Sequence, residues 1–372
     1  MSASSAPSLL DRVHDKIVEG ERLNRDEAVS LFQLDDLTAI GALADMVRRR
    51  LHPEPIVTYI VDRNINYTNV CDIYCKFCAF FRPPDHNESY LLPHERVFEK
   101  IERTLEQGGV QILLQGGVHP ELGVEYFEEL FEAIKARYPI HIHGLSPVEI
   151  IGAAEVSEVS VSEALRRLAI AGLDSIPGGG AEILAERVRR KYGRRKGGPD
   201  KWLDVMEEAH HAGLRTTATM MFGGLETLEE RIEHLERVRN LQDLTGGFTA
   251  FISWTLQPDN TLLEGKVRKA SAHEYLKMLA LSRLFIDNIR NFQVSFVTMG
   301  AKIGQTALSF GGNDFGSLML EENVVAAAGT ECLVTQDEIE HLIKATGRFP
   351  RRRNMFYEII DGRGAVMEGE SR

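Results

Sequence analysis

The stretch Cys71-Asp72-Ile73-Tyr74-Cys75-Lys76-Phe77-Cys78 holds three of the four cysteines in this 372-residue chain. Three residues separate the first two cysteines, and two separate the last two. The apolar run 56–61 precedes them and is typical of a buried strand. Thiolates are soft ligands, and three of them so close together can hold one metal centre. The stretch therefore predicts a metal site shortly after the end of a strand.

The remaining cysteine helps to choose between two kinds of metal centre. A structural zinc ion takes four protein ligands, so His86 or a distant group would have to complete the site. Cys332, the fourth cysteine, lies far away in the sequence. A 4Fe-4S cluster held by three thiolates leaves one iron open to an external ligand. The spacing favours this cluster over a zinc site or a redox-active disulfide.

Composition limits the class of protein. Hydrophobic residues make up 43% of the chain and charged residues 26%, as in a globular protein with a sizeable core. The net charge of -12 argues against a nucleic-acid surface, and the basic stretch 187–196 is either a solvated helix end or an anion-binding segment. We find no signal-peptide pattern and no apolar run long enough to span a membrane. With the clustered thiols, these features predict a cytoplasmic protein that binds neither nucleic acid nor membrane.

The apolar pattern predicts the fold. Residues 1–52 have helical spacing and are expected to form an N-terminal helical cap. Between 53 and 330, short apolar runs alternate with amphipathic helices. The predicted strands are 56–66, 111–115, 140–144, 173–176, 216–222, 247–254, 292–298 and 313–317. The main predicted helices are 96–107, 124–138, 160–171, 201–212, 228–242, 272–289 and 321–328. This alternation predicts an α/β fold closed into a (β/α)8 barrel, with residues 331–372 packed on it as a C-terminal helix and tail.

Glycine, histidine and polar residues gather where the predicted strands end. Gly116-Gly117 follows the second strand, His143 lies on the third, and Trp254 ends the sixth. The carboxyl ends of parallel strands share one rim of a barrel, where barrel enzymes place their active sites. Each feature also has a purely structural interpretation: a turn, a hydrogen-bonded imidazole inside the barrel, and a packed ring. Their common location favours an enzyme.

The three clustered cysteines, with the aromatic Phe77 just before the last one, resemble the signature of the radical S-adenosylmethionine (SAM) superfamily. The resemblance implies a TIM-type barrel with a 4Fe-4S cluster, whose open iron is chelated by the amino and carboxylate groups of SAM. The cofactor-binding residues that we assign on this basis are Phe77, Gln115, Gly116, Gly117, Ser146, Glu182 and Arg189, beside the cluster ligands Cys71, Cys75 and Cys78.

The resemblance gives some of these residues a specific role. Gly116 and Gly117 occupy the place of the glycine-rich stretch that meets the methionine amino group. Glu182 would accept from the ribose hydroxyls or the ammonium of SAM. Arg189, or alternatively Arg187, would bind the SAM carboxylate through two parallel hydrogen bonds. Glu182 and Arg189 could equally form an ion pair on a helix.

Longer blocks resemble a narrower family, the cyclic dehypoxanthinyl futalosine synthases, which are the radical SAM cyclases of the futalosine route to menaquinone. The blocks are 66–71, 78–80, 116–120, 178–184, 216–223, 246–251, 257–258 and 313–317 with 321–323, and the match spans about residues 55–330. Ser253 and Leu256 depart from the pattern, which has proline and an aromatic residue there. Because both flank Trp254, they leave the shape of this strand open.

This resemblance implies the chemistry. A 5'-deoxyadenosyl radical takes hydrogen from C4' of the ribose of dehypoxanthine futalosine, and the carbon radical closes a ring on the benzoate. Loss of one electron and one proton gives cyclic dehypoxanthinyl futalosine. The candidates for the catalytic base are His143, Asp314 and Glu322, and the candidates for substrate binding are Thr217, Trp254, Gln257 and Asn313. The anionic benzoate calls for a cationic or N–H-rich pocket.

Other functions and the partners stay open. Aminofutalosine synthase or an FO synthase-like radical SAM enzyme is the alternative activity, and an iron-sulfur electron carrier is the alternative without catalysis. A zinc-dependent barrel hydrolase is a third interpretation. The expected partners are a small-molecule substrate, an electron donor such as flavodoxin or ferredoxin, and a second copy of the chain in a homodimer.

Overall fold

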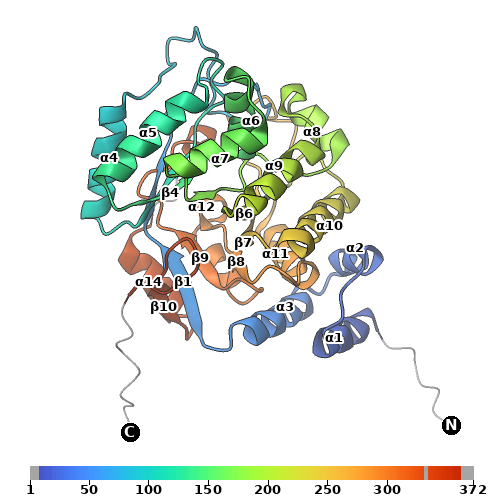
Figure 1. Cartoon of the computed structure of the whole chain (residues 1–372). Coiled ribbons are helices and arrows are strands. Elements are labelled where there is room, and N and C mark those ends of the chain that lie inside the picture. The colour runs from blue at the N-terminus through green and yellow to red at the C-terminus, as the bar shows by residue number, and fades with distance from the viewer. Residues whose placement is uncertain (1–7, 331–333, 362–372) are drawn as a thin grey trace, which may run out of the picture.

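The computed structural model describes residues 8–330 and 334–361 (Figure 1). Its strands are β1 (Ile56–Ile60), β2 (Asp62–Ile65), β3 (Gln111–Leu114), β4 (His141–Gly144), β5 (Ser175–Ile176), β6 (Arg215–Phe222), β7 (Phe248–Thr255), β8 (Asn291–Gln293), β9 (Asp314–Ser317) and β10 (Phe349–Arg352). Its longer α-helices are α1 (Leu9–Glu19), α2 (Arg25–Gln33), α3 (Leu37–Leu51), α4 (His94–Glu106), α5 (Val124–Arg137), α6 (Pro147–Val156), α7 (Val161–Ala171), α9 (Pro199–His211), α10 (Leu228–Thr245), α11 (Ala272–Phe285) and α14 (Gln336–Lys344). Its shorter helices are α8 (Glu186–Tyr192), α12 (Phe296–Met299), α13 (Ala301–Ala307) and the 3-10 turns η1 (Arg194–Lys196) and η2 (Ala326–Ala328).

The strands form one parallel sheet in the order β10-β1-β9-β8-β7-β6-β5-β4-β3-β2. β1 and β2 are the two halves of one extended segment. β1 pairs with β9, whereas β2 pairs with β3, so this one segment contacts both the late and the early strands, and the sheet curls into a barrel. Helices lie around the outside of the strands (Figure 1). The α/β barrel predicted from the alternating pattern is confirmed, and the carboxyl ends of its strands share one rim.

The N-terminal helices pack on the outside of this barrel. α2 and α3 contact α11, and α2 also contacts α10. The local sequence sets where α1 and α2 begin, because Ser8 and Asn24 each form a capping box with the residue three positions later. The three helices therefore cover one side of the barrel and contribute no residue to the lining of its cavity.

Three segments differ from the predictions. The strand predicted at 292–298 ends at Gln293, and α12 follows it. The helix predicted at 321–328 is wrong, because only η2 forms there. Glu322 accepts the backbone N–H groups of residues 324–326 and holds the chain in a turn. α6 was not predicted and begins with a capping box between Ser146 and Glu149.

The C-terminal region adds a strand as well as a helix. β10 pairs in parallel with β1, and Arg353 donates its backbone N–H to the carbonyl of Tyr59 at 2.9 Å. The following segment reaches β4, where the ring of Phe356 meets His141 edge-on. Residues 331–333 and 362–372 of the predicted tail lie outside the described residues. The end of the chain thus closes the opening that β2 leaves beside β1.

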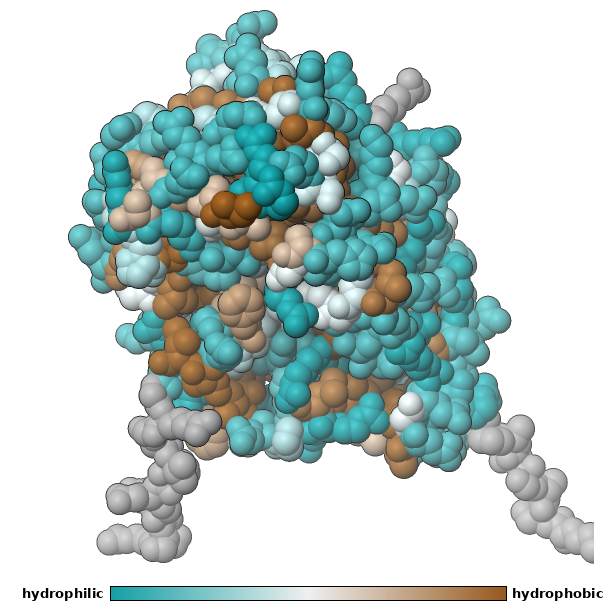
Figure 2. Space-filling model, in the orientation of Figure 1, coloured by the Kyte–Doolittle hydropathy of each residue, from teal (hydrophilic) through white to brown (hydrophobic). Residues whose placement is uncertain are grey.

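Figure 2 shows a face that is mainly hydrophilic, with hydrophobic areas toward its lower left and lower middle. In the described part of the chain, no helix has the length and apolar character required to cross a bilayer.

Candidate active site

A cavity of about 420 Å³ lies inside the barrel. At one end it is lined by the three clustered cysteines, and elsewhere by Arg353 and Tyr357 of the C-terminal segment. Every strand from β2 to β7 except β5 also contributes a side chain to its lining. The cavity therefore joins the predicted metal site to the interior of the barrel.

The cysteines are free thiols on the loop that follows β2. Burial raises the pKa of all three thiols, that of Cys75 to about 12. Among the described residues, no three histidine, cysteine or carboxylate side chains converge closely enough to share one metal ion. Each of the three thiols on this loop could bind a different iron atom of a polynuclear cluster, and metal binding would deprotonate the thiols.

Gly116 and Gly117 lie directly beneath the cysteine loop. A Cβ atom on Gly117 would be 2.1 Å from the carbonyl oxygen of Val70 and 2.7 Å from Cβ of Cys71. A Cβ atom on Gly116 would be 2.9 Å from the ring of Tyr67. Gly116 lines the cavity, as Gln115 does, whereas Gly117 does not. The two glycines let the cysteine loop pass close to the end of β3.

Arg189 does not reach the cavity, which is a correction to its predicted role. Its guanidinium is 1% exposed and donates to the carbonyl oxygens of Gly180, Ala181 and Gly197 at 2.9 Å each. These bonds hold the triglycine loop in place. The alternative, Arg187, is exposed and donates to Glu230 on α10. Neither arginine is available to a carboxylate inside the barrel.

Lys196 is the cation that does line this end of the cavity, and the sequence analysis did not single it out. Its ammonium group is ion-paired with Glu182 and lies 4.9 Å from the centre of the Phe77 ring. Phe77 and Glu182 also line the cavity. Lys196 belongs to the basic stretch 187–196, which the sequence analysis named as a possible anion-binding segment. Nothing in the sequence of this stretch indicated which of its basic residues faces the cavity.

Ser146 and Glu149 form a second fixed group at this end. The Ser146 hydroxyl donates to Oε2 of Glu149 at 2.6 Å. Oε1 of Glu149 accepts from the backbone N–H of Gly116 at 2.8 Å and from Tyr67 at 2.9 Å. Burial raises the pKa of the Glu149 carboxyl. The sequence analysis missed Glu149, although its position in a capping box after Ser146 was readable.

His143 points into the cavity from β4 and is 6% exposed. Its Nδ1 is hydrogen-bonded to the hydroxyl of Ser175 at 2.7 Å. Burial, with His141 and Arg353 nearby, holds the pKa of His143 well below its usual value. The imidazole is therefore neutral, and no described residue is hydrogen-bonded to its Nε2.

Asp314 is placed differently from the prediction of a catalytic base. It is 0% exposed and does not line the cavity. Arg353 donates to both of its oxygens, Thr58 donates at 2.5 Å, and the N–H of Gly316 donates at 2.9 Å. An aspartate with every oxygen engaged in this way holds the C-terminal segment in the barrel. It has no free lone pair to face a substrate.

Two predicted substrate ligands also lie outside the cavity lining. Asn313 accepts from Arg283 at 2.7 Å and donates to Asn291. Gln257 donates to Thr255 and accepts from Thr330. Both amides are buried, and both connect loops of the barrel. Their hydrogen-bonding groups are used within the protein.

Thr217, Trp254 and Glu322 do line the cavity. Thr217 accepts the backbone N–H of Gly178 at 2.9 Å, and burial raises the pKa of Glu322. β7 continues through Ser253 in regular register with β6, where Met221 is paired with Trp254. The two departures from the family pattern beside Trp254 therefore leave this strand regular.

The lining is rich in amide groups, which come from Asn64, Asn66, Gln111, Gln115 and Gln293. Asp62 lines it too and accepts from Gln111 at 2.8 Å and from Ser317. Both cations of the lining are neutralised within the protein, Lys196 by Glu182 and Arg353 by Asp314. The amides stand among mainly apolar side chains, and the side-chain N–H groups of Asn66 and Gln111 already donate within the protein.

Comparison with known proteins gives two family matches. The Radical SAM superfamily model matches residues 65–238, and the CofH/MqnC C-terminal region matches residues 245–365. The cyclic dehypoxanthine futalosine synthase of Halalkalibacterium halodurans is 49% identical over 94% of this chain and 95% of its own. That of Streptomyces coelicolor is 46% identical over 94% of this chain and 88% of its own. The FeFe-hydrogenase maturase HydG from Carboxydothermus hydrogenoformans has a similar structure, with a TM-score of 0.74, 19% identity, and coverage of 94% of this chain and 80% of its own.

Proposed function

The chain belongs to the radical SAM superfamily, in the group with a CofH/MqnC C-terminal region, and on this premise we propose that it converts dehypoxanthine futalosine to cyclic dehypoxanthinyl futalosine. The observation that carries the proposal is the 49% identity to a cyclic dehypoxanthine futalosine synthase along nearly the whole chain. The cavity supports it, because three free thiols, a neutral histidine and a tryptophan face one enclosed space.

Cys71, Cys75 and Cys78 would hold three irons of a 4Fe-4S cluster, with SAM on the fourth. When bound, these groups supply the radical that takes hydrogen from the substrate ribose. Gln115, Gly116 and Ser146 at the cysteine end of the cavity are the proposed contacts of SAM. The ion pair of Lys196 and Glu182 also lies at this end, next to Phe77. Lys196 replaces Arg189 as the proposed partner of the SAM carboxylate, because only Lys196 faces the cavity.

The chain's own task in the rest of the cavity is placement and proton removal. The indole of Trp254 offers a flat face on which a benzoate ring can stack. The amides of the lining can donate to its carboxylate. His143 is the proposed base, because its neutral Nε2 has no partner within the described chain. Glu322 is less suited, since its oxygens already accept three backbone N–H groups.

The remaining expectations belong to the same proposal. The electron enters from a carrier such as flavodoxin or ferredoxin in the cytoplasm, and the chain acts as a homodimer. The acidic net charge of -12 supports the absence of a nucleic-acid partner.

An anaerobic assay tests the function. The reconstituted protein is given SAM, dithionite and dehypoxanthine futalosine, and the products are read by mass spectrometry. We expect a product two hydrogen atoms lighter than the substrate, formed together with 5'-deoxyadenosine. Formation of 5'-deoxyadenosine with the substrate untouched would refute the cyclase and leave a different radical SAM reaction. A bound cluster with neither product would favour an electron carrier.

A further inference from the structure

The position of His143 raises the question of where its proton goes. The side chain is buried in the barrel, and a positive charge there is disfavoured by burial, by His141 and by Arg353. A base that gains one proton in every turnover must lose it before the next. His143 therefore needs a route to solvent that does not leave an imidazolium inside the barrel.

We propose that Ser175 and His141 form a proton relay that carries the proton from His143 toward solvent at the amino ends of the barrel strands. This inference rests on the proposed function, in which His143 accepts the proton lost on ring closure. The geometry that carries it is one hydroxyl between two imidazoles. Oγ of Ser175 lies 2.7 Å from Nδ1 of His143 and 2.7 Å from Nε2 of His141.

A serine hydroxyl can donate one hydrogen bond while it accepts another, so this chain can have a direction. With the proton of His143 on Nδ1, His143 donates to Ser175, and Ser175 donates to Nε2 of His141. Nε2 of His143 is then a bare acceptor that faces the cavity. Ser175 itself is 0% exposed, so no water competes for its hydroxyl.

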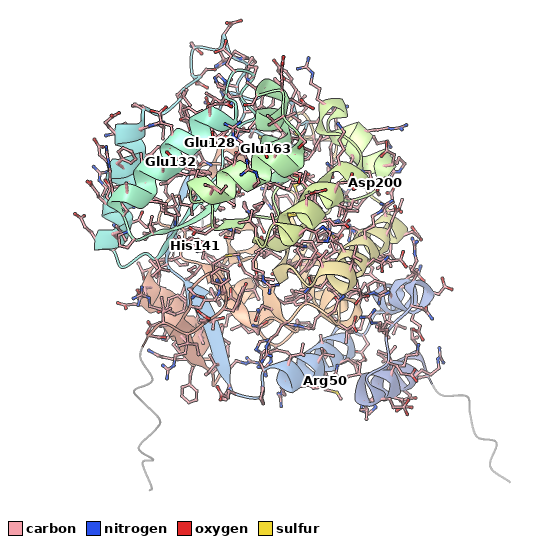
Figure 3. All side chains as sticks on the ribbon, viewed as in Figure 1. Arg50, Glu128, Glu132, His141, Glu163 and Asp200 are labelled. Atoms are coloured by element: carbon pink, nitrogen blue, oxygen red, sulfur yellow. The ribbon has the colours of Figure 1, made fainter. Side chains whose placement is uncertain are left out.

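The far end of the chain reaches a carboxylate and solvent. The His141 side chain is 18% exposed, and its Nδ1 lies 4.0 Å from Oδ2 of Asp174, whose side chain is 31% exposed. Lys135 fixes Asp174 from α5 at 2.5 Å, and the backbone N–H of Ile142 donates to the same oxygen at 2.6 Å. In Figure 3, His141 lies between α5 and the C-terminal elements of the chain.

The proton balance is simple. As the substrate's proton binds Nε2 of His143, the proton on Nδ1 moves to Ser175, and the hydroxyl proton of Ser175 moves to Nε2 of His141. The electron pair of the broken C–H bond stays in the substrate ring, and the one electron that the ring then loses would pass to the oxidised iron-sulfur cluster that Cys71, Cys75 and Cys78 would hold. The positive charge then resides on His141, beside Asp174, and its Nδ1 releases a proton to solvent. Once the product has left, Nε2 of His143 gives its proton to water in the cavity while the relay runs in reverse and His141 regains its Nδ1 proton from solvent. Nδ1 of His143 is then protonated again, and its Nε2 is bare for the next turnover.

Substitution of the hydroxyl tests the relay. Ser175→Ala removes the hydroxyl that bonds both imidazoles, whereas Ser175→Thr keeps a hydroxyl at the same position. We expect Ser175→Ala to keep forming 5'-deoxyadenosine but to lower the yield of cyclic product per 5'-deoxyadenosine about 10-fold or more; this is less than the roughly 100- to 10,000-fold typical for loss of the base itself, because His143 is retained. Ser175→Thr should restore most of it.

The histidines of the chain provide a second variant and a matched control. His141→Phe blocks the relay at its partly exposed end and keeps the packing on Phe356. His210→Gln is the control, because His210 also bonds two hydroxyls, those of Thr216 and Thr245, but does not line the cavity. All variants must match wild type in iron content and melting temperature, and His141→Phe serves if Ser175→Ala fails to fold.

The solvent isotope effect separates a relay from a structural role. In the wild type, product formation in mixtures of H2O and D2O should show a curved dependence on deuterium fraction, as expected for more than one proton in motion. Ser175→Ala and His141→Phe should lose this curvature, and His210→Gln should keep it. Unchanged product ratios and unchanged curvature in both relay variants, with an active wild type, would overturn the relay. An inactive wild type would instead refute the proposed function.

Discussion

Gly117→Ala is the substitution for which the structure makes the most direct prediction. The new methyl group would lie 2.1 Å from the carbonyl oxygen of Val70 and 2.7 Å from Cβ of Cys71. Neither neighbour is the free end of a side chain. Val70 forms a β-bridge with Arg82, and the N–H of Cys71 donates to the carbonyl of Arg82, so both neighbours belong to a fixed backbone. The backbone of the cysteine loop would therefore have to move by more than about 1 Å to reach an ordinary contact distance of roughly 3.4 Å.

The magnitude follows from the cost of overpacking. An extra methyl group in a well-packed site costs about 1–3 kcal/mol. If the loop avoids that strain by moving, the cost falls on the conformation that binds the cluster, and cluster affinity decreases about 5- to 150-fold. The substitution introduces no charge and removes no ligand, so any loss of iron reports the position of the loop.

The assay is the iron and sulfide content per chain after anaerobic reconstitution in the presence of a competing chelator. Gly193→Ala is the matched control, because its methyl group would also face the cysteine loop but at 3.5 Å from Sγ of Cys75 and 3.6 Å from the carbonyl of Ile73. We expect the control to retain the cluster and Gly117→Ala to lose most of it. Equal iron retention in the two variants would refute the argument that Gly117 positions the loop.

Three further predictions follow from the site and the core. Cys75→Ala should abolish both cluster and turnover, whereas Cys332→Ala should leave iron content and activity intact; loss of the cluster in the latter would mean four protein ligands. Trp254→Ala should weaken substrate binding about 2- to 10-fold, because the contact with the indole ring is lost, and should leave SAM affinity unchanged, as measured by equilibrium binding. An unchanged substrate Kd would show that Trp254 does not contact the substrate. His234 is fully buried, and burial lowers its pKa from 6.5 to about 3, so below pH 6.5 the unfolded chain takes up a proton that the folded chain excludes. Stability should therefore fall as the pH drops from 6.5 towards 3, by about 2 kcal/mol at pH 5 for this residue, and His234→Gln should flatten that part of the urea-denaturation profile.

The sequence predicted the parts of the site that depend on local chemistry. Three thiols within eight residues predict a metal site wherever the chain places them. Gly116 and Gly117 were recognised because a glycine pair after a strand signals a close approach. His143 was recognised because it lies on a predicted strand close to the end that reaches the rim of the barrel. None of these inferences required knowledge of which distant residues the fold brings next to these side chains.

Partners distant in the sequence were not predictable in this way. The sequence suggested Asp314 as a base at the end of a strand, but Arg353, 39 residues later, donates to both of its carboxylate oxygens. Arg189 looked like a ligand for a carboxylate, but it turns toward loop carbonyls while Lys196 turns inward. A single sequence gives the identity of such side chains and not their direction.

The sequence by itself determined the alternation of strands and helices, and hence the barrel, because hydrophobic periodicity is a local property of each segment. It also determined the cysteine loop and the rim on which it lies. Only the tertiary structure decided which polar groups face the cavity, because closing the barrel brings together residues that are separated by dozens of positions. β10 and the segment after it show this most clearly, since no local pattern indicated that the end of the chain would pair with β1. Arg353 and Tyr357 line the cavity because this pairing brings them there.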